Sequence, residues 1–155
     1  MSDLMTVGPA EELLKRRRAR AGIEHFMEYM REHDVAPEFD HQPAKHHELL
    51  IDHAMALIDH DRDEKLLLAS MPPGSAKSTY LSIVLPCWLL LRDPKLQILC
   101  VTNSEGLSDR FARARRAILR SPQWERLAGT TLAPDAQSLA YCGTPAGGYI
   151  RSLSI

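Results

Sequence analysis

The sequence predicts an α/β fold in which a parallel sheet with flanking helices follows an N-terminal helical segment. Two short, continuous apolar runs, residues 65–70 and 96–102, have the length and composition of buried parallel strands. Each run precedes a longer segment whose apolar residues recur at helical spacing, and this alternation is typical of a parallel sheet. With 155 residues, of which 45% are hydrophobic and 25% charged, the chain has the size and composition of one globular domain.

The first 60 residues predict helices. Residues 10–34 favour one helix, or two helices that break at Gly22, and residues 33–43 form a connector with two prolines. Residues 44–60 favour a further helix, with an apolar stripe that includes Leu50, Ile51 and Ala54. We therefore divide the chain into an N-terminal helical segment with its connector, residues 1–43, and the beginning of an α/β domain, residues 44–155.

A polar turn over residues 60–64 precedes the first predicted strand, KLLLAS. A helix is expected from about Lys77 to Leu91, interrupted at Pro86 because proline has no N–H. After the second strand, Thr102 and Glu105 fit a capping box that opens a helix reaching about Arg120. The remaining segments predict a loop at 123–136 and a hairpin that joins 138–142 to 149–155 around GTPAGG.

The stretch MPPGSAKST, residues 71–79, has the features of a phosphate-binding loop. The usual pattern is G-x-x-x-x-G-K-[ST], and here Lys77 and Ser78 stand correctly, whereas Met71 and Ala76 replace the two glycines. Such a loop cradles phosphate with its backbone N–H groups at the start of a helix. Because Ala76 stands where the helix begins, we expect a helical backbone to tolerate its methyl group. The alternative is an ordinary strand-to-helix turn.

Four stretches together resemble the N-terminal part of the ATPase domain of a phage terminase large subunit, the motor that packages viral DNA. They cover most of the chain from about residue 20: QPAKHHELL (42–50), MPPGSAKST with LPCWLLLRDP (85–94), ILCVTNSEGLSDRFARARRAIL (98–119) and GGYIRSLSI (147–155). Terminases commonly have a Pro-Pro-rich loop in place of the first glycine, and some carry alanine before the lysine. The resemblance implies a P-loop NTPase-like fold, incomplete in this chain, with ATP and Mg²⁺ as cofactors.

The resemblance also assigns roles to residues. Lys77 would be the catalytic lysine that holds the β- and γ-phosphates, and Ser78 would ligate magnesium. Gln42 could hydrogen-bond adenine, and His46 or His47 could stack on it, although His47 also lies on the apolar face of its predicted helix and could be a core residue. The nucleotide-binding residues implied are Gln42, His46, Gly74, Ser75, Ala76, Lys77, Ser78 and Thr79.

Partners follow from the resemblance rather than from composition. It implies double-stranded phage DNA, the portal protein and the small terminase subunit, with a homo-oligomeric ring for a full-length motor. The basic run KRRRAR (15–20) and the arginines Arg113, Arg116 and Arg120 could contact DNA or a neighbouring subunit. A solvated helix surface is the alternative for both groups.

Composition indicates a cytoplasmic protein, which for this family means the bacterial host cytoplasm. The N-terminus has no apolar leader, and the longest apolar run, residues 83–91, is too short to cross a bilayer. Its three cysteines are widely spaced and form no CxxC pair, so we expect buried thiols and no zinc site. The net charge of −1 does not by itself indicate a nucleic-acid partner.

Hydrolysis needs a further part, an apolar strand that ends in two acids, and none follows residue 79. We therefore expect an N-terminal fragment, without the Walker B strand and the nuclease domain, that is inactive as an ATPase alone. Two alternatives remain open. The chain could belong to another P-loop ATPase, such as a helicase-like enzyme, or it could be a non-catalytic prophage remnant or assembly module.

Overall fold

The computed structural model describes residues 8–59, 63, 65–136 and 138–155. Its N-terminal half is helical: α1 (Pro9–Ala21), α2 (Ile23–Glu32), a short 3₁₀ turn η1 (Pro37–Phe39) and α3 (Lys45–Ile58). Gly22, in an extended conformation, separates α1 from α2, so the two-helix alternative is correct. Of the turn expected at 60–64, only Asp63 belongs to the described residues.

The helix after the loop is irregular in the turns that precede Pro86. A π-helical stretch, η2 (Thr79–Val84), continues into α4 (Leu85–Arg92), and the N–H of Leu85 donates to the carbonyl of Tyr80 five residues earlier. Because Pro86 has no N–H, the carbonyl of Ser82 loses its α-helical donor. The guanidinium of Arg115 donates to that carbonyl instead. The helix changes from π to α next to Pro86 and continues to Arg92, so the structure shows a local irregularity there and not the interruption that we expected.

A three-stranded sheet has the order β1-β3-β2, with β1 at Gln97–Thr102, β2 at Tyr141–Gly143 and β3 at Tyr149–Ser154. β1 runs parallel to β3, with Ile98 opposite Ile150, while β2 and β3 form the expected antiparallel hairpin. The helix α5 (Glu105–Leu119) follows β1 and packs against both β1 and β3. Residues 97–102 and 105–119 thus adopt the structures that the sequence predicts.

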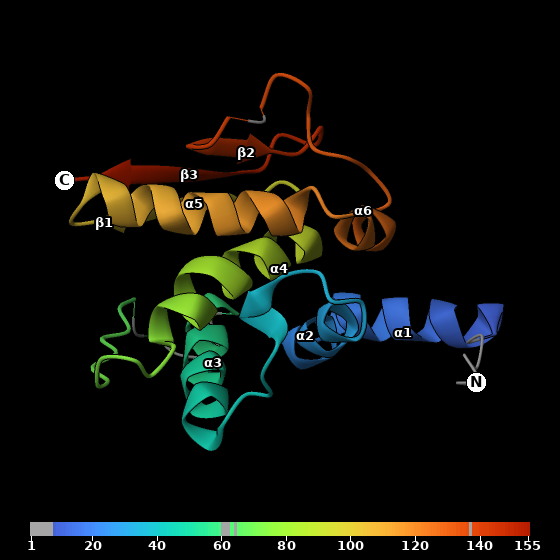
Figure 1. Cartoon of the computed structure of the whole chain (residues 1–155), viewed down its shortest axis with the longest axis horizontal. Helices are drawn as coiled ribbons and strands as arrows, with labels where there is room; N and C mark the ends of the chain where they lie inside the picture. The colour runs from blue at the N-terminus through green and yellow to red at the C-terminus, as the bar shows by residue number, and fades with distance from the viewer. Residues whose placement is uncertain (1–7, 60–62, 64, 137) are drawn as a thin grey trace.

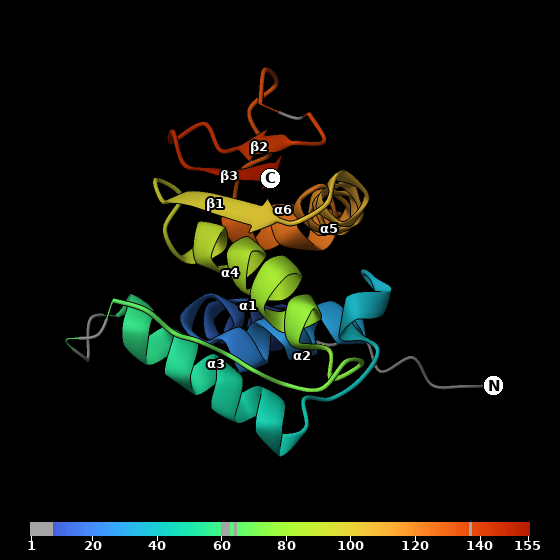
Figure 2. The ribbon, with the colours of Figure 1, turned by 90° about the vertical axis from the view of Figure 1, so that its left-hand side faces the viewer.

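The predicted fold class is wrong. The structure is mainly helical, and its small sheet is mixed, so it is not a P-loop NTPase-like parallel sheet with flanking helices. Residues 65–70 form neither helix nor strand and pair with no strand of the described chain, and Leu66 and Leu68 are 81% and 88% exposed. Figures 1 and 2 show this segment following α3, on the other side of α4 from the sheet. An apolar run becomes a strand only where a partner strand satisfies its backbone.

Two smaller expectations also fail. The segment 123–136 was expected to be a loop, yet α6 (Pro122–Ala128) forms there, because Ser121 accepts a hydrogen bond from the N–H of Trp124 and caps it. The cap of α5 is Ser104, whose side chain accepts from the N–H of Leu107. Thr102 is the last residue of β1 and donates to the carbonyl of Ser104.

One hydrophobic core joins the helical half to the sheet. Figure 2 shows the order of the layers: the sheet, then α4 with α5 beside it, then α1 and α2, and finally α3. The indoles of α4 and α6 tie the layers together, since Trp88 donates to the carbonyl of Ala19 at 3.1 Å and Trp124 to that of Cys87 at 3.3 Å. In the part of the chain described, no helix has the length and apolar character needed to cross a membrane.

Candidate phosphate-binding site

The loop at 71–79 begins with a tight turn that its sequence specifies. The N–H of Ser75 donates to the carbonyl of Pro72 at 3.3 Å, and Gly74 has φ +81°. These are the features of a type II turn, which favours proline at its second position and glycine at its third, as Pro73 and Gly74 provide. The Pro-Pro-Gly sequence therefore reverses the chain before the helix starts.

Ala76 does not have the helical backbone that we expected. Its φ is +55°, in the left-handed region, and the chain becomes helical only at Lys77. The glycine of the usual motif fits this conformation without cost, whereas an L-residue with a side chain is strained there by about 1–2 kcal/mol. Only Ala76 separates the type II turn, which ends at Ser75, from the helix, which begins at Lys77, so the change of chain direction between them falls on this residue.

The backbone N–H groups of the loop are largely free. That of Ser75 is used in the turn, but no described residue accepts a hydrogen bond from the N–H groups of Gly74 or residues 76–79. N–H groups within a helix donate to carbonyls of the preceding turn, but those of the first turn have no such helical carbonyl. Here the type II turn and the left-handed Ala76 also direct the preceding chain away from these N–H groups. A row of free N–H groups at a helix start is suited to an anion.

His47 holds the loop from the outside. Its Nδ1 accepts from the N–H of Ala44 at 3.0 Å, so the ring proton is on Nε2, which lies 2.8 Å from the carbonyl oxygen of Ser75. A trans peptide directs its C=O and the following N–H to opposite sides, so the N–H of Ala76 points away from His47. The ring also packs on Tyr80, with centroids 4.4 Å apart. His47 thus has a structural role in orienting the loop.

A surface pocket of about 550 Å³ lies over the loop. All of residues 71–79 line it on one side, and Leu107, Arg110 and Phe111 of α5 line it on the other. Neither Lys77 nor Arg110 has a hydrogen-bond or ion-pair partner among the described residues. No Asp or Glu is among the described residues that line it, so this lining combines two cationic side chains with free N–H groups.

The residues implied as adenine contacts do not reach this pocket. Gln42 lines a different and smaller pocket, of about 240 Å³, with residues of α2 and α3. His46 is exposed on the first turn of α3, and its ring contacts that of His47, with centroids 3.9 Å apart. Among the three candidates, only His47 contacts the loop, and adenine binding by Gln42 or His46 stays a prediction.

Ser78 and the three cysteines are side chains that could bind a metal or act as nucleophiles. The Ser78 side chain, expected to bind magnesium, is exposed at the pocket, but no cluster of three His, Cys, Asp or Glu residues suited to a metal occurs among the described residues. Burial raises the pKa of all three thiols, most strongly that of Cys87. Cys87 and Cys142 are buried as expected, whereas Cys100 is half-buried.

The arginines of α5 differ from one another in ways that the sequence did not reveal. Arg113 pairs with Asp109 on its own helix, with 3.6 Å between Nη2 and Oδ2. Arg115 is 2% exposed and donates to Ser152 at 2.6 Å. Sequence analysis missed both Arg115 and the pocket-lining Arg110. For Arg115 the available signal was its i+4 spacing from Phe111, which places it on the same helix face as that buried ring.

The basic run 15–20 is partly engaged within the protein. Lys15 pairs with Glu32 at 2.9 Å and Arg16 with Glu12 at 2.7 Å, while Arg20 donates to the carbonyl of Leu127 on α6. Burial by itself would raise the pKa of Glu12, but hydrogen bonds from Arg16 and Tyr29 together with the charge of Arg16 bring that pKa below its usual value. Part of this basic run is therefore used within the protein, in one ion pair to α2, one ion pair within α1 and one hydrogen bond to α6, and an external partner for it stays a prediction.

Comparisons with known proteins give no relative. No family model matches the chain, and no match was found among curated proteins or among solved structures.

Proposed function

We propose that residues 71–79 bind the phosphate groups of ATP, and that the chain is the ATP-binding part of a DNA-packaging motor of the terminase large-subunit type. One observation carries the proposal: the N–H groups of Gly74 and residues 76–79 have no acceptor in the described chain, and Lys77 beside them has no ion-pair partner. The resemblance to terminases supports ATP as the nucleotide.

Each part of the loop has a distinct task in this proposal. The free N–H groups surround one phosphate, and the ammonium group of Lys77 neutralises the charge of its neighbour. The hydroxyl of Ser78 would hold Mg²⁺, which screens the phosphate charges. His47 and the type II turn keep the N–H groups oriented before the ligand arrives, which lowers the entropic cost of binding.

Binding, not turnover, is the activity proposed for this chain alone. No carboxylate that could activate water is among the described residues that line the pocket. We expect phosphate release from ATP to be no faster than with the Lys77→Ala variant, unless another chain supplies the acid.

The test is equilibrium binding of ATP with Mg²⁺, measured by titration calorimetry. Charge-assisted hydrogen bonds contribute about 1.5–3 kcal/mol, so Lys77→Ala should weaken binding by roughly 10- to 150-fold. Lys95→Ala is the matched control, because Lys95 is exposed in the connection between α4 and β1 and lies outside the pocket. Equal affinity of wild type and Lys77→Ala, or no binding by wild type, would overturn the proposal.

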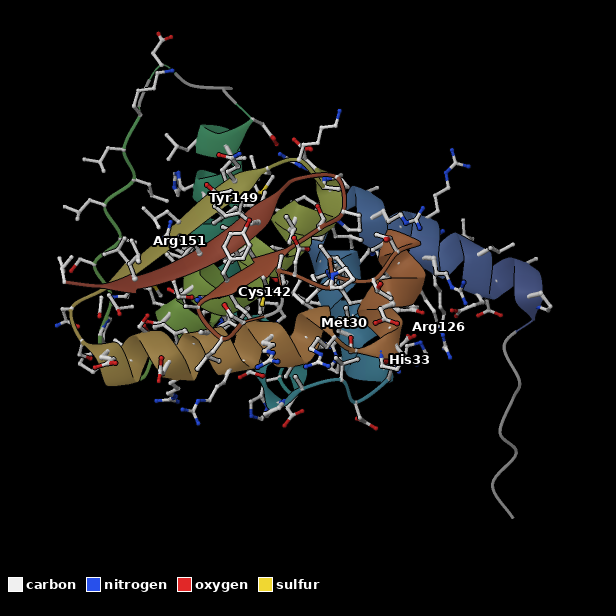
Figure 3. All side chains as sticks on the ribbon, turned by 90° about the horizontal axis from the view of Figure 1, so that it is seen from above. Met30, His33, Arg126, Cys142, Tyr149 and Arg151 are labelled. Carbon is white, nitrogen blue, oxygen red and sulfur yellow. The ribbon has the colours of Figure 1, made fainter. Side chains whose placement is uncertain are left out.

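A second candidate, an assembly module that binds protein, has its own supporting observation. Leu66 and Leu68 are almost fully exposed, and Leu99 and Val101 of β1 are exposed on the open face of the sheet. Figure 3 looks onto this face, where Tyr149 and Arg151 of β3 lie. Light scattering separates the two functions. Self-association that Leu68→Ser abolishes, together with no ATP-dependent rise in Tm, would favour the assembly module.

A further inference from the structure

The wall of the pocket opposite the loop carries a cation that the loop motif does not include. Arg110 lies on the second turn of α5, next to Phe111, which is 8% exposed and packs into the core. Because Phe111 anchors this turn, the rotation of α5 is fixed, and Arg110 lines the pocket together with Leu107. The position of Arg110 thus follows from core packing.

Arg110 is also the arginine of α5 that the protein leaves available at the pocket. The guanidinium of Arg113 pairs with Asp109, and that of Arg115 is consumed by Ser82 and Ser152. Arg110 is exposed and has no hydrogen-bond or ion-pair partner in the described part of the chain. A guanidinium free of internal partners can form a bidentate contact with a phosphate.

The two cations lie on different walls. Lys77 belongs to the loop and Arg110 to α5, and the pocket of about 550 Å³ extends from one to the other. A single phosphate held by the loop N–H groups fills only the loop side, whereas a chain of linked phosphates can reach both sides. Among the described residues of the lining there is no carboxylate to repel the negative charge of the longer ligand.

We infer that Arg110 is a second phosphate-binding residue, and that it makes the site selective for linked phosphates over a single inorganic phosphate. This inference rests on the proposed function, since it concerns the same pocket. It adds a residue outside the loop motif and names the ligand class as polyphosphate, which includes the triphosphate of a nucleotide.

The experiment compares inorganic phosphate, pyrophosphate and tripolyphosphate by titration calorimetry on the full chain. Wild type should bind tripolyphosphate at least about 10-fold more tightly than phosphate. Arg110→Ala should weaken tripolyphosphate binding by about 10-fold or more but phosphate binding by less than about 3-fold. Arg113→Ala removes the same charge one turn away, at a residue outside the pocket lining, and should change neither affinity by more than about 2-fold.

Each outcome separates the inference from the proposed function. If wild type binds none of the three anions, or binds them as well after Lys77→Ala, the proposed function fails. If binding depends on Lys77 but Arg110→Ala behaves like Arg113→Ala, or if phosphate and tripolyphosphate bind equally, only the inference about Arg110 is overturned. Because Arg110 is exposed, its substitution should change the free energy of unfolding by no more than about 0.5 kcal/mol, which urea titration checks.

Discussion

Residues 65–70 and the strand β1 are two short apolar runs of similar length, and their surroundings in the folded chain differ. β1 pairs in parallel with β3 from Gln97 to Thr102, and its inward residues Ile98 and Cys100 pack against the core. In KLLLAS only Leu67 packs against the core, while Leu66 and Leu68 face solvent. What distinguishes the two segments is a partner strand on one side and a covering helix on the other.

The comparison teaches that a short apolar run can form a strand, but that it does so only where another strand is available to pair with it. Backbone N–H and C=O groups need acceptors and donors, and β1 finds them on β3. Both runs nevertheless lead into the candidate site: the first into the loop with Lys77, and β1 into α5 with Arg110. The two walls of the pocket therefore differ in how firmly the preceding segment is held.

The largest expected effect contrasts a residue that the sheet buries with one that the unpaired run exposes. Ile150 of β3 is 2% exposed, so Ile150→Ala should lower the free energy of unfolding by about 2–5 kcal/mol. Leu68→Ala should change it by no more than about 0.5 kcal/mol. Urea denaturation followed by circular dichroism measures both. A loss above about 1.5 kcal/mol for Leu68→Ala would break the comparison, because residues 65–70 would then be packed like β1.

A smaller effect is expected from the buried guanidinium that ties β3 to the helix after the loop. Arg115→Ala leaves the carbonyl of Ser82 and the hydroxyl of Ser152 without their donor, so it should cost about 2–4 kcal/mol. Arg113→Ala, which removes an exposed pair, should cost less than about 0.5 kcal/mol. Equal unfolding midpoints in urea for the two variants would show that the hydrogen bonds of Arg115 contribute nothing to stability.

The smallest effect concerns the left-handed residue of the loop. Ala76→Gly relieves backbone strain and so stabilises the folded protein by about 1–2 kcal/mol. The greater conformational freedom of glycine in the unfolded chain offsets about 0.5–1 kcal/mol of this gain. The net expectation is a gain of about 0.5–1 kcal/mol in the free energy of unfolding. Ala117→Gly makes the same change at an exposed helical position and should lose about 1 kcal/mol. If both substitutions lowered the free energy of unfolding, the positive φ at Ala76 would be contradicted.

Local signals in the sequence were sufficient for much of the chain. Helical periodicity located α1 to α5, Gly22 marked the break between α1 and α2, and Pro86 marked the irregular stretch before α4. Alternation and turn residues located the hairpin of β2 and β3. These features depend on residues that are close in sequence, so the residue pattern of one sequence is enough to predict them.

The fold class depends on contacts between distant residues, which the pattern does not contain. Nothing in KLLLAS indicates that the described chain places no strand beside it, and the left-handed backbone of Ala76 was indicated only by the glycine that the usual motif has at that position. The pocket residue Arg110 and the buried Arg115 belong to the same helix and differ only in what surrounds them. Their roles required the packing of α5 against the sheet and the loop.

The most direct test of the account is a titration of ¹⁵N-labelled protein with tripolyphosphate, followed through the backbone amide signals. The account predicts that the largest shifts fall on Gly74 and residues 76–79, with smaller shifts around Arg110 on α5, and that Lys77→Ala suppresses them. Shifts confined to the basic residues of α1, or no shifts at millimolar tripolyphosphate, would contradict a phosphate site at the loop.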